Sequence, residues 1–326
     1  MIGRSERPAS RRSTTLEVVV LRALGLGDFL TAVPALRALQ AAAGRVTVAA
    51  PAALAPLARL AGCELLAAAP LKPLPSAARE ARLLVNLHGR GPQSHSVAIA
   101  ACPRRLIAFE HHAIALTAGM PSWRSDEHEV ERWCRLLGES GIPADPTQVG
   151  LPPPSLPAEL QAARGATVVH PGAASAARRW PAERFATVAA AEERAGRSVI
   201  LTGSGAERSL ALAVADRAGL DQRRVLAGHT DLGALAAVIA HAGRVVCGDT
   251  GVAHLATAFG VPSVVLFGPT SPKIWGPPAP PADAPAGRHR VLWHGTTGDP
   301  HADRPDPGLL AIDAPRVIDA LAELPT

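Results

Sequence analysis

Short apolar runs alternate along the chain with segments in which apolar residues recur three or four positions apart. The runs are rich in Val, Ile, Leu and Ala, and their length of a few residues predicts strands. The predicted strands cover residues 16–21, 45–50, 82–87, 167–170, 198–202, 245–247 and 263–267. The segments with helical periodicity cover residues 30–39, 127–139, 181–195, 206–218, 232–241, 252–259 and 315–324. Strands that alternate with helices form parallel sheets covered on both faces, so the pattern predicts an α/β fold.

A proline-rich stretch interrupts this pattern near the middle of the chain. Pro152, Pro153 and Pro154 lie in it, and proline can neither continue a helix nor occupy a central strand. The length of 326 residues also favours two domains. We therefore predict a disordered basic arm over residues 1–15, a first domain over 16–150, a linker over 151–165, a second domain over 166–312 with a long loop at 277–307, and a last helical segment over 313–326.

The basic and aromatic residues of the chain do not form the pattern of a nucleic-acid-binding protein. The net charge is +5, but nearly all basic residues are Arg, a bias typical of GC-rich codon usage, and only Lys72 and Lys273 are lysines. The dense basic stretch is the N-terminal arm, and aromatic residues make up only 3% of the chain. Nucleic-acid proteins combine a basic patch with stacking aromatics, so we expect no nucleic-acid partner.

Targeting and metal signals are weak. No apolar run reaches the roughly 18 residues that span a bilayer, and no secretory signal is visible. We expect a cytoplasmic protein, with peripheral contact between the basic arm and the inner face of the membrane as an open alternative.

The four cysteines form no C-x-x-C pair, which disfavours a disulfide framework or a zinc site. His111 and His112 are adjacent and would not share a helix face, so no metal site is predicted.

The first loop that could bind or react with a ligand is Gly25-Leu26-Gly27-Asp28, directly after the first predicted strand. Ligands of open α/β sheets bind at the carboxyl ends of the strands. The dinucleotide fingerprint needs a third glycine at position 30, where this chain has Leu30, and a carboxylate would repel a pyrophosphate. Asp28 is instead suited to face a neutral hydroxyl as a general base. The alternative is a plain helix N-cap, a position at which Asp is favoured.

Two further loops follow strands of the second half. The segment from His170-Pro171-Gly172-Ala173 to Arg178 and Arg179 combines small residues, cations and a helix start, which suits an anion. A solvated basic loop is the alternative.

The third loop is Thr202-Gly203-Ser204-Gly205-Ala206-Glu207. Its acid, Glu207, could bind ribose or sugar hydroxyls. Alternatively, Glu207 only complements the dipole of the following helix.

The fourth loop is Cys247-Gly248-Asp249-Thr250-Gly251, followed by His254 one helical turn later and by Phe267-Gly268-Pro269-Thr270 after the next strand. A threonine hydroxyl and bare N–H groups at a helix start can meet a diphosphate. Asp249 can bind sugar hydroxyls or cap the helix. His254 is either a ligand of the donor or a satisfied, half-buried histidine. The presence of four such loops together is more specific than any single one.

At these residues the chain resembles glycosyltransferase family 9, whose best-known members are ADP-heptose lipopolysaccharide heptosyltransferases. The resemblance rests on segments that occur in order between about residues 16 and 275. They are Leu24-Gly25-Leu26-Gly27-Asp28 with Pro34-Ala35-Leu36, His170-Pro171-Gly172-Ala173 with Arg179-Trp180-Pro181 and Phe185, Thr202-Gly203-Ser204 with Glu207, Asp249-Thr250-Gly251-Val252-Ala253-His254, and Phe267-Gly268-Pro269-Thr270. One departure is Arg178, where the family usually has Lys; Arg keeps the charge but is not an equivalent donor.

The resemblance implies a GT-B architecture, in which two Rossmann-like domains face each other across a cleft and a C-terminal helix returns to the first domain. It also implies inverting, metal-independent sugar transfer to a glycan or glycolipid, with no cofactor and an ADP-linked sugar as co-substrate. Asp28 would then deprotonate the acceptor hydroxyl, with Gly25 and Gly27 on the acceptor side. The expected donor-binding residues are Ser175, Arg178, Thr202, Gly203, Glu207, Asp249, Thr250, Gly251, His254, Gly268, Pro269 and Thr270.

Three other activities stay open at this point. A nucleotide-sugar 2-epimerase shares the architecture and would change the sugar without an acceptor. A catalytically idle protein would bind the nucleotide and transfer nothing. A nicotinamide-dependent dehydrogenase is disfavoured by the missing third glycine.

Overall fold

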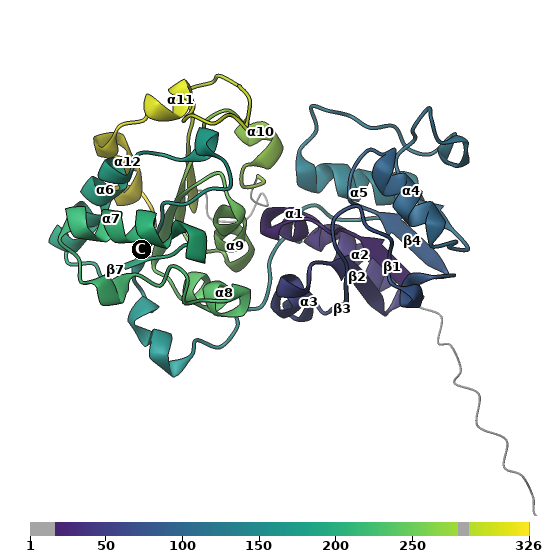
Figure 1. The fold of residues 1–326 in the computed structure, drawn as a ribbon, viewed down its shortest axis with the longest axis horizontal. Helices are drawn as coiled ribbons and strands as arrows, with labels where there is room; N and C mark the ends of the chain where they lie inside the picture. The colour runs from purple at the N-terminus through teal and green to yellow at the C-terminus, as the bar shows by residue number, and fades with distance from the viewer. Residues whose placement is uncertain (1–16, 280–286, 326) are drawn as a thin grey trace, which may run out of the picture.

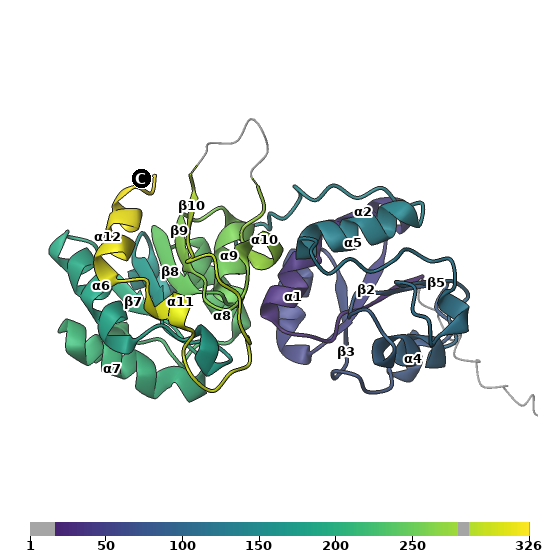
Figure 2. The ribbon, with the colours of Figure 1, turned by 90° about the horizontal axis from the view of Figure 1, so that it is seen from above.

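The computed structural model describes residues 17–279 and 287–325, which form two α/β domains, each built around a five-stranded parallel sheet (Figure 1). The predicted N-terminal arm lies outside the described residues. The two sheets lie side by side along the long axis of the molecule, with helices on their faces (Figure 2). The alternation of apolar runs and helical segments therefore predicted the fold class correctly.

The first sheet has the strand order β3-β2-β1-β4-β5. Its strands are β1 (Val18–Leu21), β2 (Val46–Ala50), β3 (Glu64–Ala67), β4 (Leu83–Asn86) and β5 (Leu106–Ile107), and the helices of this domain are α1 (Leu26–Thr31), α2 (Val33–Ala43), α3 (Ala55–Leu60), α4 (Gln93–Ala100) and α5 (Glu129–Glu139). The central strands β1 and β2 are fully buried, as their continuous apolar runs predict. The sequence analysis did not predict β3 and β5, because β3 is a half-exposed edge strand and β5 has only two residues.

The second sheet has the order β10-β9-β8-β6-β7. Its strands are β6 (Thr167–His170), β7 (Val199–Leu201), β8 (Arg244–Gly248), β9 (Ser263–Leu266) and β10 (His289–Leu292), and the helices are α6 (Ala182–Arg194), α7 (Arg208–Ala218), α8 (Leu232–Ala240), α9 (Gly251–Phe259), α10 (Pro272–Trp275), α11 (Pro307–Leu310) and α12 (Ala314–Ala322). The segment predicted as a loop over residues 277–307 thus contains an edge strand. β10 pairs with β9 in parallel register, a long-range contact that its mixed sequence does not signal.

The last helix differs from the expectation based on the family resemblance. α12 packs against α6, β9 and β10 of the second domain, and Val317 and Leu321 belong to that domain's core. The chain just before α12 is also bound to the second domain, since the indole N–H of Trp180 donates to the Ile312 carbonyl at 2.9 Å. Arg244 also donates to the Leu321 carbonyl at 2.8 Å. The expectation that this helix returns to the first domain is therefore wrong.

The two domains meet where α1 and α9 begin, each directly after a central strand of its sheet (Figure 1). Two glycines permit this close approach. A Cβ atom on Gly251 would lie 2.7 Å from the side chain of Leu26, and one on Gly27 would lie 2.9 Å from the ring of His254. Real Cβ contacts are not this short, so both positions require glycine as long as the helices pack in this way. The loop that carries Asp28 is thereby held against the loop that carries Asp249.

Candidate functional site

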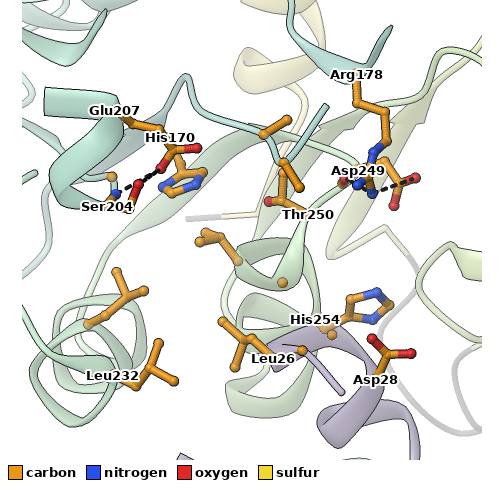
Figure 3. Close-up of a pocket in the computed structure, with 18 of the residues that line it drawn as sticks. Leu26, Asp28, His170, Arg178, Ser204, Glu207, Leu232, Asp249, Thr250 and His254 are labelled. Carbon is orange, nitrogen blue, oxygen red and sulfur yellow. Dashed lines mark hydrogen bonds and ion pairs between the residues drawn. The ribbon is translucent and has the colours of Figure 1, made fainter. Parts of the chain in front are cut away.

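A cleft of about 920 Å³ lies between the two domains, at the carboxyl ends of their strands. Its lining comes from both domains, as Figure 3 shows for many of these residues. The first domain contributes Gly25, Leu26, Gly27, Asp28, Ala52, Ala53 and Pro56. The second contributes His170, Ala173, Ala174, Arg178, Gly203, Ser204, Glu207, Thr230, Asp231, Leu232, Leu235, Asp249, Thr250, Gly251, Val252, His254, Thr270, Trp275, Pro300 and His301. The four loops singled out in the sequence therefore converge on one site.

Asp28 is the acid of the first domain in this cleft. The N-cap of α1 is Gly25, so Asp28 lies within the first turn of the helix and does not cap it. The interpretation of Asp28 as a plain N-cap is therefore wrong. Its side chain is 30% exposed and forms an ion pair of 3.4 Å with Arg22. In the close-up, the carboxylate lies beside His254 of the opposite domain (Figure 3). A carboxylate in this place is accessible to a substrate hydroxyl.

The opposite wall combines a cation with the start of a helix. Arg178 donates to the backbone carbonyl of Asp249 at 3.2 Å, and its Nη1 lies 3.9 Å from the Asp249 carboxylate. Thr250 is the N-cap residue of α9, and its buried hydroxyl has no hydrogen-bond partner among the described residues. A buried hydroxyl normally has a partner, so this group is suited to bind a ligand. Together with the unpaired N–H groups of a helix start, Arg178 and Thr250 make this wall suited to an anion, and we call it the anion pocket.

Asp249 lies inside this anion pocket, with only 6% of its surface exposed. Burial raises its pKa, while the charge of Arg178 and a hydrogen bond from Thr270 act in the opposite direction. The cation therefore compensates part of the cost of keeping this carboxylate ionised. The binding of sugar hydroxyls by Asp249 stays a prediction.

Glu207 takes part in capping the helical segment that begins at Gly205 and also lines the cleft. Its Oε2 accepts from the backbone N–H of Ser204 at 2.7 Å and from the Ser204 hydroxyl at 2.8 Å, which completes a capping box. Burial opposes its ionisation, but these bonds and the charges of His170 and Arg179 together hold its pKa below the usual value. Gly172 makes room for the acid, because a Cβ there would lie 2.2 Å from the Glu207 carboxylate. The carboxylate is therefore ionised, fixed in place and still part of the cleft wall.

Four predicted donor-binding residues do not line the cleft, and two of them, Thr202 and Ser175, contact residues that do. Thr202 is fully buried and lies with its hydroxyl 3.0 Å from His170 Nδ1. Ser175 accepts from Arg178 Nε at 3.4 Å and donates to the Pro300 carbonyl at 2.6 Å. The others are Gly268, which packs against Asp306 and Leu309, and Pro269, which is not part of the cleft lining. The prediction that these four line the donor site is not met in this structure, because Thr202, Gly268 and Pro269 are buried and the Ser175 hydroxyl is bound to Arg178 and Pro300.

Part of the wall carries no signal in the sequence. Pro56, Leu232 and Leu235 give one end of the cleft an apolar lining, between α3 and α8. Residues of this type usually belong to a core, and only the packing of the domains shows that they face a cavity. Trp275 also lines the cleft and lies 6.1 Å from His254, measured between ring centres.

This geometry agrees with a comparison to known families. A model described as "Glycosyltransferase family 9 (heptosyltransferase)" matches residues 109–289, which is more than half of the chain. The chain belongs to glycosyltransferase family 9. The family predicted from the loop motifs is thus confirmed.

Relatives of this family 9 glycosyltransferase support the assignment. Lipopolysaccharide heptosyltransferase 2 of Escherichia coli (strain K12) is 30% identical over 168 residues, which are 45% of this chain and 48% of the relative. The chain thus spans about half the length of the curated relative that it matches. The structure of the family 9 glycosyl transferase from Veillonella parvula DSM 2008 has a TM-score of 0.74 and 21% identity, covering 94% of this chain and 96% of that one. That of E. coli ADP-heptose lps heptosyltransferase II has a TM-score of 0.72 and 20% identity, covering 94% and 98%.

These structural likenesses extend over both domains and confirm the predicted GT-B architecture. Across residues 17–279 and 287–325 of the family 9 chain, no helix combines the length and the hydropathy needed to cross a membrane. Within the same ranges, His, Cys, Asp and Glu side chains do not gather in groups of three that could hold a metal ion.

His254 of this family 9 glycosyltransferase makes stability depend on pH. Burial, followed by the charge of His128, lowers the pKa of His254 to about 4, although Glu129 acts in the opposite direction. Between pH 4 and the ordinary value of 6.5, the unfolded chain binds a proton here that the folded chain does not. The stabilisation is therefore complete above pH 6.5, declines as the pH falls and is lost below about 4. We expect a decrease in the free energy of unfolding on the order of 3 kcal/mol from this group.

Urea unfolding at several pH values between 4 and 7 measures this dependence. His254→Gln should make the free energy of unfolding less dependent on pH in that window. His289→Gln is a matched variant outside the cleft, because burial lowers the pKa of His289 to about 4 as well. His289→Gln should likewise make the free energy of unfolding less dependent on pH between 4 and 7, without changing ligand binding. A His254→Gln protein with the wild-type pH dependence would contradict the assignment of a neutral His254.

Proposed function

We propose that this chain is an inverting, metal-independent glycosyltransferase that moves a sugar from a nucleotide-diphosphate donor to a hydroxyl of a glycan or glycolipid. The observation that carries the proposal is that an accessible acid of the first domain faces an anion pocket of the second domain across one cleft. Group transfer between two substrates needs both to be held in one place with their reacting atoms aligned. A cleft with a different domain on each side meets this requirement.

The acceptor is proposed to bind on the side of Asp28. Its hydroxyl is neutral and becomes a good nucleophile only as its proton leaves, which is the task of a general base. Asp28 is accessible at the cleft wall, and Gly25 leaves the space beside the carboxylate free, since a Cβ there would lie 3.6 Å from Asp28 Oδ2. Asp28 takes the proton while the oxygen attacks the anomeric carbon of the donor sugar.

The donor diphosphate is proposed to bind at the N-terminus of α9. Negative charge grows on the diphosphate as the bond to the sugar breaks, and Arg178 with the Thr250 hydroxyl and the Gly251 amide lies in position to stabilise it. These donors supply the positive field that a divalent cation provides in other enzymes. The proposed base and the proposed leaving-group site belong to opposite walls of the cleft, which supports attack from the face opposite the leaving group and hence inversion.

The nucleoside is proposed to occupy the remaining part of the cleft. Glu207 offers an ionised carboxylate to the ribose hydroxyls, and the apolar end with Pro56, Leu232 and Leu235 suits a flat base. A similar structure carries ADP-heptose in its name and a relative is a lipopolysaccharide heptosyltransferase. We therefore propose ADP-linked heptose as the donor and a lipopolysaccharide-type glycan as the acceptor, with the reaction at the cytoplasmic side of the membrane.

Ligand binding and product analysis test this function. In thermal unfolding with ADP, GDP, UDP or dTDP, the preferred nucleotide raises the melting temperature as its concentration increases, and we expect ADP to have the largest effect. Incubation with ADP-heptose should release ADP at a rate that depends on a glycan acceptor and is unchanged by a chelator. NMR of the product should show the inverted anomer. A sugar altered in the absence of acceptor would instead identify an epimerase, and nucleotide binding without turnover would identify an idle binding protein.

A further inference from the structure

The buried cation Arg22 contacts Asp28, the carboxylate proposed as the general base. Arg22 follows β1 and is only 1% exposed, yet each nitrogen of its guanidinium has at least one hydrogen-bond acceptor. Its Nε donates to the Asp28 carbonyl at 2.8 Å, its Nη1 donates to the Leu87 carbonyl, and its Nη2 donates to Thr31 Oγ1 and to Glu129 Oε1, both at 3.1 Å. The same Nη2 lies 3.4 Å from Asp28 Oδ1. Arg22 therefore holds Asp28 at both its backbone and its side chain.

This double contact restricts how the Asp28 carboxylate can turn. One carboxylate oxygen is drawn toward the guanidinium, while the backbone of the same residue is fixed by Nε and by the Thr31 hydroxyl, which donates to the Asp28 carbonyl at 2.9 Å. The other oxygen is left for a ligand in the cleft. Only arginine offers several donors in one rigid, planar fork, so another residue could not satisfy these partners together.

A second layer of residues keeps the cation in place. Glu129 on α5 accepts from Arg22 and, through the same oxygen, from the indole N–H of Trp133 at 3.0 Å. Its other oxygen pairs with Arg132. The Arg22 guanidinium also lies over the Trp133 ring, 4.7 Å from its centre. A buried charge needs such a partner to remain in the interior, and α5 supplies it through Glu129.

We propose that Arg22 is the positioning residue of Asp28, and that it acts on the reaction only by fixing the orientation of that carboxylate. This inference rests on the proposed function, in which Asp28 is the general base. A misplaced catalytic group can cost about a hundredfold in rate even when nothing else changes. The expected consequence is a loss of turnover without a loss of donor binding, because Arg22 is not part of the cleft lining.

A double-mutant cycle tests this inference on the full chain. Arg22→Met should lower kcat roughly 10- to 100-fold and leave the KM for ADP-heptose within about twofold. Arg22→Lys keeps the charge but not the fork, so it should also lose about tenfold or more in kcat. In the Asp28→Ala background, Arg22→Met should change the residual rate by less than about threefold, because groups that act as a unit are not additive.

Arg37→Met is the matched control. Arg37 lies on α2 of the same domain and also donates to backbone carbonyls, those of Gln148 and Gly150, but it does not line the cleft. Its kcat should equal that of the wild type. ADP affinity and melting temperature report whether each variant is folded, and Arg22→Lys decides the matter if Arg22→Met does not fold. Effects of Arg22 and Asp28 that multiply would overturn the positioning role alone. A wild-type rate in Asp28→Ala would overturn the proposed function and Arg22's role with it.

Discussion

Asp28→Ala is expected to lower kcat by roughly a hundredfold or more while donor binding stays nearly normal. The reason is that Asp28 is accessible from the cleft and belongs to the first domain, whereas the anion pocket is built from the second. Losing a positioned base removes the proton transfer but none of the groups that hold the diphosphate. Steady-state kinetics with ADP-heptose and a glycan acceptor, together with calorimetric titration of ADP, measures the two effects separately.

Asp28→Asn is the isosteric companion to this variant. The amide keeps the shape of the side chain and cannot accept the proton, so its loss of kcat should be similar to that of Asp28→Ala. Both proteins should melt as a single transition near the wild-type temperature, since Glu129 still pairs with Arg22 in the interior. Turnover at the wild-type rate in both variants would remove Asp28 from the role of base.

Arg178→Met is expected to lower kcat on the order of 10²- to 10³-fold, the usual consequence of removing a donor aimed at developing charge. The Arg178 side chain is 23% exposed, lines the cleft and lies beside the start of α9. Its charge should matter more as the diphosphate leaves than when the donor first binds. ADP affinity should therefore decrease less than kcat. Measuring kcat and the Kd for ADP on the same preparation distinguishes the two.

Arg178→Lys tests the one departure from the family motif. It keeps a positive charge at the position where lysine is usual in the family, so kcat should remain within about tenfold of the wild type. Arg194→Met, at an exposed position on α6, is the matched control and should be fully active. An Arg178→Met protein as active as this control would place the stabilisation of the leaving group elsewhere.

Much of the site could be predicted from the sequence because its chemistry is local. Glycines, small residues and polar side chains directly after apolar runs mark the carboxyl ends of parallel strands, where ligands bind. On this basis Asp28, Arg178, Glu207, Asp249 and Thr250 were selected, and all of them line one cleft. The same reasoning overextended to Thr202 and Gly268, because a motif does not reveal which of its members face the ligand and which face the core.

The contacts that hold the base in place could not be read in this way. Arg22 and Glu129 are separated by 107 positions, and each alone is an ordinary charged residue. Their pairing depends on how α5 packs in the folded first domain, where it lies against α2. The edge strand β10 and the placement of α12 on the second domain depend on long-range contacts in the same way.

The sequence by itself therefore determined the α/β class, the two domains' alternating elements and the identity of the loops that carry reactive side chains. These follow from periodicity and from residue types within a few positions of one another. The tertiary structure decided which of those side chains share the cleft, how close α1 and α9 approach at Gly27 and Gly251, and which buried cation supports Asp28. Such features arise from the packing of segments far apart in the chain, and no local pattern encodes them.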